Sequence, residues 1–324
     1  MKNLNHVPAI IEDYTNYLFG ILGYSLETVK GYKRDLIEFF SFIKEYHKIN
    51  TPLNMFNIFI LKQIKKQDIL AYQVYLNYSK DNSPFTRQRK IFSIKSFFNW
   101  LYDNYPGGDG NPAKKIPIIQ KVVRLPKYLN IEQSKKIQKI FTIQNSKYPI
   151  RNNCIISLFL STGIRVGELV NIKIKDINLD EKKILIYGKG KKERIVYLNK
   201  VCIKQLKEYI EYRKRKENTK ELDCNSALFI NKNNKRLGVD GIEDICCKAY
   251  KLMGLEDKKY TTHTLRHTAA SLIYIYVKQD ILLLKKFLGH ESITSTQIYT
   301  HIYNGTVKDA VDKNPLNLEI KKIA

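Results

Sequence analysis

A run of prolines and glycines just after the first hundred residues restricts the fold more than any other feature. Residues 106–112 read Pro-Gly-Gly-Asp-Gly-Asn-Pro, and Pro117 and Pro126 follow among basic residues. Proline lacks a backbone N–H and glycine has a freely rotating backbone, so no helix or strand is expected to cross this stretch. The 324 residues are enough for two domains of ordinary size. The sequence therefore predicts a domain over residues 1–110, a linker over residues 111–126 and a larger domain over residues 127–324.

The first domain is expected to be helical throughout. Ser25 can cap a helix in which apolar residues recur every three or four positions from Val29 to Ile43. Asp68 begins another helix, whose apolar side is formed by Leu70, Val74 and Tyr78. Ser83 followed by Pro84 is a typical helix start, and the third helix should continue to about residue 102.

The second domain is expected to mix helices with a small sheet. Residues 130–133 can form a capping box for a helix reaching residue 141, and a buried helix over 151–160 should end at Gly163. Two segments rich in β-branched residues, 183–187 and 194–198, enclose a basic tip that contains glycine, which is typical of a hairpin. Further helices are expected at about residues 200–217, 239–253, 262–277, 280–288 and 293–303.

The net charge points to a polyanionic partner. The chain has 56 Lys and Arg against 31 Asp and Glu, which gives +25, although 44% hydrophobic and 27% charged residues are ordinary for a globular protein. Such an excess destabilises a compact chain by self-repulsion, so nucleic acid explains it better than a biased composition does.

The amino terminus and the cysteines indicate a cytoplasmic protein. No apolar core of a signal peptide precedes Glu12 and Asp13, and no apolar stretch approaches the roughly 18 residues of a membrane span. The five cysteines are scattered and form neither a C-x-x-C metal pair nor a disulfide framework. We expect a reduced protein of the bacterial cytoplasm, associated with the nucleoid and without a membrane partner.

Five short segments carry residues suited to phosphate chemistry. Arg165 follows a glycine, and Glu168 lies three residues later, where it could orient the arginine. Lys189 stands between two glycines at the expected hairpin tip, and His290 follows a glycine at an expected helix end. His263, Arg266 and His267 share one helical face, and Tyr299 lies nine residues after His290. His263 and His267 could bind a metal, but Arg266 between them favours an anion instead.

In order and spacing, these residues resemble the catalytic set of the tyrosine recombinases, the family of the phage integrases and Xer-type recombinases. The resemblance covers roughly residues 10–315. The six catalytic positions of the family correspond to Arg165, Lys189, His263, Arg266, His290 and Tyr299. It implies an all-α N-terminal DNA-binding domain, a SAM-like four-helix bundle, and an α-rich α+β catalytic domain with a small β-hairpin sheet. It also implies that a tail over about residues 307–312 contacts a neighbouring subunit in a tetramer on DNA.

The residue types fit cleavage of a DNA strand through a 3′-phosphotyrosyl intermediate, with neither ATP nor a metal. Arg165 and Arg266 can present planar donors to the non-bridging oxygens, where negative charge develops, and His290 can add a hydrogen bond. His263 is the candidate base for the Tyr299 hydroxyl, because imidazole titrates nearest neutral pH. The resemblance assigns Lys189 the role of the acid that protonates the departing 5′-oxygen. No cofactor is expected.

Basic residues on the predicted helices of the first domain are candidates for contacts with double-stranded DNA, on faces opposite the apolar residues. These candidates are Lys30, Lys33, Arg34, Arg87, Arg89, Lys90 and Lys95.

Three other functions stay open at this stage. A type IB topoisomerase-like enzyme would use almost the same chemistry, a DNA-binding regulator would lack catalysis, and a metallohydrolase would use His263 and His267. For a site-specific recombinase, the sequence is compatible with Xer-like dimer resolution or with integration and excision of a mobile element, alone or with a paralogous recombinase.

Overall fold

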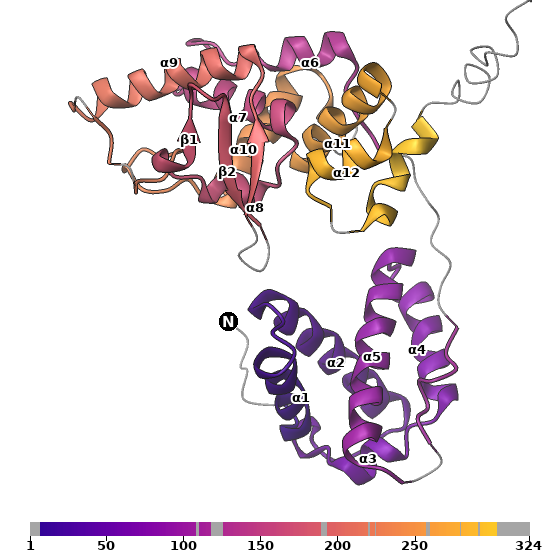
Figure 1. Cartoon of the computed structure of the whole chain (residues 1–324). Coiled ribbons are helices and arrows are strands. Elements are labelled where there is room, and N and C mark those ends of the chain that lie inside the picture. The colour runs from indigo at the N-terminus through magenta and orange to yellow at the C-terminus, as the bar shows by residue number, and fades with distance from the viewer. Residues whose placement is uncertain are drawn as a thin grey trace, which may run out of the picture. The chain divides into compact units, whose positions relative to one another are not determined.

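The structure, a computed structural model, describes residues 7–107, 110–117, 126–188, 193–219, 221–223, 225–256, 260–278, 280–290 and 292–302. The chain divides into two compact units, Met1–Val123 and Arg124–Ala324. Figure 1 shows an N-terminal unit made of helices and a C-terminal unit that combines helices with a small sheet. In the described residues, no helix is long and apolar enough to cross a membrane.

Five α-helices build the N-terminal unit in the residues that the structure describes. They are α1 (Ala9–Gly20), α2 (Leu26–Tyr46), α3 (Ile58–Lys62), α4 (Lys66–Tyr78) and α5 (Pro84–Asn104). Helix α2 packs against α1, α4 and α5. The core between them is aromatic: the Phe39 ring meets Tyr72 and Phe98 edge to face, and Phe40 meets Phe97 in the same way. Such pairs add to the stabilisation that their buried area already provides.

The helix starts of this unit follow from local side-chain chemistry. The Ser25 hydroxyl accepts a hydrogen bond from the Thr28 N–H at 3.3 Å, and Ser83 accepts one from Thr86 at 3.2 Å, with Pro84 at the first helical position. These two predicted helix starts are confirmed. Helix α4 begins two residues before Asp68, whose carboxylate accepts the Lys65 N–H at 2.8 Å.

The predicted apolar face of α4 is wrong. Val74 is 57% exposed and Tyr78 82% exposed, whereas Ile69, Tyr72 and Leu76 are buried. Apolar residues occupy almost every face of this helix, so their periodicity alone does not decide which face packs against α2 and α5.

The first part of the expected linker packs on the N-terminal unit. Ala113 and Ile116 are buried in its core, and the Lys95 ammonium donates to the Ile116 carbonyl at 3.1 Å. Residues 118–125, the rest of this stretch up to Pro126, lie outside the described residues.

The C-terminal unit contains seven of the labelled helices and a three-stranded antiparallel sheet. The first elements are α6 (Ile131–Ile137), α7 (Pro149–Thr162), α8 (Val166–Asn171), β1 (Ile177–Asn178), β2 (Lys183–Tyr187) and β3 (Glu193–Tyr197). They are followed by α9 (Lys200–Lys216), α10 (Val239–Leu252), α11 (Thr262–Ile273), α12 (Ile281–Leu288) and 3₁₀ turns at Ile293–Ser295 and Gln297–Ile302. The strands are ordered β1-β2-β3, and Lys183 pairs with Tyr197 while Tyr187 pairs with Glu193.

Helix α7 is the centre of this unit, since it packs against both α9 and α11. It ends as predicted at Gly163, whose φ of 58° is left-handed. The capping box is also confirmed: the Asn130 side chain accepts the Gln133 N–H at 2.8 Å, although α6 stops at Ile137 rather than residue 141. Strand β1 was not predicted, and the segment expected as a helix over residues 293–303 forms 3₁₀ turns where it is described.

Candidate active site

A groove of about 1100 Å³ lies on the C-terminal unit where four segments distant in sequence converge. Arg165 comes from the start of α8, Arg194 from β3, His263 from α11, and His290 from the turn after α12. Three of these four residues are candidates from the sequence. Lys189 lies outside the described residues, while Gly188 and Glu193 on either side of the hairpin tip line the groove.

Arg165 is held at the start of α8 by Glu168. The Glu168 carboxylate accepts the Arg165 backbone N–H at 2.8 Å and its guanidinium Nη1 at 3.2 Å. The arginine side chain remains 44% exposed, whereas Glu168 is buried. The contact expected between these two residues is therefore present, and it leaves the arginine side chain partly exposed.

Arg194 is a member of this site that the sequence analysis missed. Its Nη1 and Nη2 each donate to one oxygen of Glu168 at 2.7 Å. Burial alone would raise the pKa of Glu168, but the hydrogen bonds from Arg194 and Arg165 outweigh it and lower that pKa. A signal was available in the sequence: residues 194 and 196 face the same side of β3, and Val196 is buried, so Arg194 is a charged residue on the inward face of a strand.

Arg266 is buried beside the groove and is engaged on several sides. It donates to the carbonyls of Gly163 and, at 2.9 Å, of Leu288, and its Nη2 lies 2.9 Å from His290 Nε2. Burial, followed by the charge of Arg165, lowers the pKa of Arg266 to about 10, so the guanidinium stays charged at neutral pH.

His290 takes its place through the glycine that precedes it. Gly289 ends α12 with a left-handed φ of 63°, as predicted for this turn. Burial and the charge of Arg266 lower the pKa of His290 to about 4, so its imidazole is neutral. A guanidinium only donates, so Nε2 is the acceptor, and Nδ1 carries the proton and donates to the Thr296 hydroxyl at 3.0 Å.

Tyr299 is buried, and its hydroxyl pairs with His267. The phenol oxygen lies 2.8 Å from His267 Nδ1, and the tyrosine is 1% exposed. Burial lowers the pKa of His267 to about 4 and raises that of Tyr299 to about 12, so both partners of this hydrogen bond are neutral. His263 lines the groove, where burial and then Arg266 and Arg165 lower its pKa. The structure thus places His267, not the expected base His263, at the hydroxyl, and Tyr299 is absent from the described lining of the groove.

The arrangement suits an anion. Arg165 and Arg194 both bind the carboxylate of Glu168, and Arg266 lies beside His290, so three guanidinium groups gather at or beside a groove whose described lining has two carboxylates, Glu168 and Glu193. Within the part of the chain that the structure describes, no group of three or more His, Cys, Asp or Glu side chains is placed to hold a metal ion.

The DNA-contact candidates of the N-terminal unit fall into two groups. Lys30 and Arg34 are exposed one turn apart on α2, and Lys33 pairs with Glu12 at 3.4 Å. On α5, by contrast, the ammonium of Lys90 contacts Glu38 at 2.5 Å and the side chain is buried, so its expected position on an exposed face is wrong.

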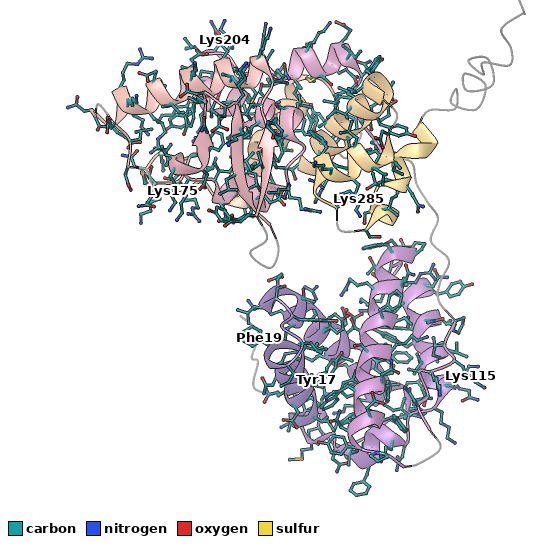
Figure 2. All side chains as sticks on the ribbon, viewed as in Figure 1. Tyr17, Phe19, Lys115, Lys175, Lys204 and Lys285 are labelled. Carbon is teal, nitrogen blue, oxygen red and sulfur yellow. The ribbon has the colours of Figure 1, made fainter. Side chains whose placement is uncertain are left out.

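The other α5 candidates also face their own unit to different degrees. Arg89 forms a two-pronged pair with the buried carboxylate of Asp35, Lys95 donates to the Ile116 carbonyl, and Arg87 is half-buried. Because α2 packs against α5, Arg89 and Lys90 meet carboxylates of α2. Figure 2 shows Lys204 of α9 and Lys285 of α12 at opposite sides of the C-terminal unit, so basic side chains are not confined to one face there.

Both units match known families. Residues 11–104 match the N-terminal SAM-like domain of phage integrases, and residues 129–305 match the phage integrase family itself. The chain belongs to the phage integrase family. It is 38% identical over 320 residues to tyrosine recombinase XerC of Caldanaerobacter subterraneus subsp. tengcongensis, covering 96% of this chain and 88% of that protein. It is 31% identical to tyrosine recombinase XerD of Oceanobacillus iheyensis, covering 92% of this chain and 95% of that protein. The chain is therefore a tyrosine recombinase, as the resemblance of its motifs predicted.

Solved structures share the fold of this tyrosine recombinase. The XerH site-specific recombinase bound to a difH substrate aligns with a TM-score of 0.69 at 24% identity, covering 94% of this chain and 83% of that chain. The Tn1549 transposon integrase in complex with transposon right end DNA aligns with a TM-score of 0.71 at 17% identity, covering 94% and 98%. The predicted fold class, a SAM-like helical domain with an α-rich catalytic domain and a small sheet, is confirmed.

Proposed function

We propose that this tyrosine recombinase cleaves and rejoins DNA strands at a specific site, with Tyr299 as the nucleophile and a 3′-phosphotyrosyl link as the intermediate. The observation that carries the proposal is the groove itself. Arg165, His263 and His290 line it, and the buried Arg266 contacts His290. A phosphodiester that entered this groove would meet fixed donors on several sides.

The donors act on the charge that develops at phosphorus. Attack by the phenol oxygen forms an O–P bond, breaks the bond to the 5′-oxygen and concentrates charge on the two non-bridging oxygens. His290, whose Nε2 accepts from Arg266 in the present structure, can donate to phosphate only after that nitrogen takes up a proton. The exposed guanidinium of Arg165 can contact one of the two oxygens, and Arg266 can contact the other. Because hydrogen bonds fix these groups beforehand, little reorganisation is needed in the transition state, and one such donor contributes about 3–4 kcal/mol.

The protons also need places to go. The phenolic proton leaves Tyr299 for an imidazole, and the departing 5′-oxygen takes a proton from Lys189, the acid implied by the family pattern. His263 is the base that the pattern implies, while His267 holds the hydroxyl in the present structure. The phosphotyrosyl link keeps the energy of the broken phosphodiester, so attack by a 5′-hydroxyl reverses the chemistry, and no nucleotide need be hydrolysed.

The partner we propose is double-stranded DNA, bound by several copies of this chain. Related proteins of the same fold have been solved on DNA, among them a lambda integrase tetramer bound to a Holliday junction. The net charge of +25 and the exposed pair Lys30 and Arg34 support DNA binding by this chain. A homotetramer, alone or with a paralogous recombinase, would then exchange strands in dimer resolution or in movement of a mobile element.

Covalent capture tests the chemistry and needs no defined target sequence. A library of duplexes with random sequence, each carrying a nick, is incubated with the protein. DNA that stays attached to the protein after denaturation in detergent is recovered and sequenced. A nick lets the short 5′-ended piece diffuse away, so the protein remains trapped on its site. We expect enriched DNA with the wild type and none with Tyr299→Phe, although the Phe variant should still shift the enriched duplex in a gel.

Two results would overturn the proposal. Covalent DNA with Tyr299→Phe would show that another residue is the nucleophile. Capture without any enriched sequence, together with relaxation of supercoiled plasmid and no strand exchange, would indicate a topoisomerase-like enzyme instead.

A further inference from the structure

We propose that Arg194 is a positioning residue. Through contacts with Glu168 and Gly289 it holds the guanidinium of Arg165 and the turn before His290 in a fixed arrangement, which we call the frame. The inference rests on the proposed function, since it assigns a role in the same strand cleavage. Arg194 lies on β3, directly after Glu193, and pairs across the sheet with Ile186.

The first half of the frame is the carboxylate of Glu168. It accepts four hydrogen bonds, two from Arg194 at 2.7 Å each and two from Arg165, one from the backbone and one from the side chain. A carboxylate offers about four acceptor positions, so Glu168 is fully used. If Arg194 were absent, the buried anion would have Arg165 as its remaining charged partner among these contacts and would draw that guanidinium inward, away from the groove.

The second half of the frame is the backbone at Gly289. A Cβ placed on this glycine would lie 2.7 Å from both Cδ and Nε of Arg194 and 3.0 Å from its Cζ. The arginine stem therefore packs directly on the residue that precedes His290. Because the turn needs a left-handed φ of 63° as well, glycine is the residue that meets both demands.

Exposure distinguishes the roles of the two arginines. Arg194 is 18% exposed, and both of its terminal nitrogens are engaged by Glu168, whereas Arg165 is 44% exposed and gives one terminal nitrogen to that carboxylate. Arg165 is thus the arginine that can reach a phosphate in the groove, and Arg194 acts through it. Arg194 also stands at the base of the hairpin, so the same ion pair links β3 to the start of α8.

A double-mutant cycle with Arg165 tests this role. Arg194→Lys keeps the charge but cannot form the two-pronged contact. With the nicked duplex selected by covalent capture, we expect the single-turnover cleavage rate to fall 10- to 100-fold and the Kd for DNA to change less than threefold. In an Arg165→Lys background, Arg194→Lys should change the rate less than twofold further, because its effect passes through Arg165. Arg215→Lys, at an exposed position on α9, is the matched control and should cleave at the wild-type rate.

If the fold reductions in cleavage rate of the two single variants multiply in the double variant, the inference is overturned, because Arg194 would then act independently of Arg165. A weaker Kd with an unchanged cleavage rate would also overturn it and would make Arg194 a DNA contact. If Arg194→Lys melts well below the wild type, the double variant Glu168→Gln, Arg194→Met is tested instead, because it leaves no buried charge unpaired. Cleavage by this double variant at the wild-type rate would refute the role of Arg194. Failure of the proposed function would look different, since the wild type itself would then trap no DNA.

Discussion

Gly289→Ala is the smallest substitution that tests the packing of this active site. The added Cβ would lie 2.7 Å from two atoms of Arg194, against an ordinary contact of about 3.5–4.0 Å. Alanine in the left-handed region costs about 1–2 kcal/mol by itself. Arg194 cannot swing aside without loosening its contacts with Glu168, and hydrogen bonds to charged groups contribute about 1.5–3 kcal/mol. We therefore expect Gly289→Ala to destabilise the C-terminal unit by about 2.5–5 kcal/mol, from the sum of these ranges.

Gly254→Ala separates the two contributions. Gly254 has nearly the same left-handed backbone, with φ of 69°, but no heavy atom lies within 4 Å of the position of its Cβ. It should therefore cost only the backbone part, about 1–2 kcal/mol. For a unit of this size each kcal/mol lowers the melting temperature by about 2–4 °C, so calorimetry resolves the two variants.

The Arg194→Ala substitution removes the side chain that the new Cβ would contact and serves as the third test. In an Arg194→Ala background, Gly289→Ala should cost no more than Gly254→Ala does, because the clash is gone. Equal costs of the two glycine substitutions in the wild-type background would refute the packing argument, and so would an undiminished cost of Gly289→Ala once Arg194 is removed.

The remaining predictions concern pH and DNA binding. Burial holds the pKa of His267 and His290 at about 4, below the usual 6.5, so the unfolded chain takes up these protons first. The free energy of unfolding should therefore be highest above pH 6.5 and decline as the pH falls toward 4. The midpoint of urea denaturation should fall less over this range for His290→Asn than for the wild type. A wild-type midpoint that does not change with pH would contradict the reasoning. Replacing Lys30 and Arg34 by Ala should weaken DNA binding and reduce the log–log salt slope by about 2, as expected for two lost phosphate contacts. Lys90→Met should leave that slope unchanged while lowering the melting temperature of the helical unit, and a loss of binding as large as that of the exposed pair would show that Lys90 reaches DNA.

Local signals in the sequence predicted most of the elements. Ser83 with Pro84 starts α5, and Gly163 and Gly289 end α7 and α12, because each of these effects depends only on the residue and its immediate neighbours. The groove-lining residues Arg165, His263 and His290 were likewise found from short motifs. These are positions at which a few consecutive residues decide the backbone.

Pairings between distant segments could not be predicted in this way. Arg194 meets Glu168 because the β2–β3 hairpin folds back on α8, and His267 meets Tyr299 because α11 packs beside the last 3₁₀ turn. The sequence shows the polar residue in each case but not its partner. The same limit explains Lys90, which a helical projection places on a polar face and the packing of α2 against α5 buries.

Burial makes Tyr299, the nucleophile we propose, less reactive. A pKa of about 12 instead of the usual 10 makes the phenolate about 3 kcal/mol harder to form, so a tyrosine in this position is a poor nucleophile. Among the described residues, the cluster around it has Ala270, Tyr274, Leu284 and Leu288 as its other buried members. The segment Gln297–Ile302 is a 3₁₀ helix, whose hydrogen bonds have poorer geometry than those of an α-helix. Release of Tyr299 from His267 would expose a fully buried side chain, a cost that contacts with DNA would have to offset, but it would also relieve the raised pKa while the frame around Glu168 stays as it is. We accordingly expect DNA to act on the last 3₁₀ turn, and the groove to be ready for phosphate before the nucleophile arrives.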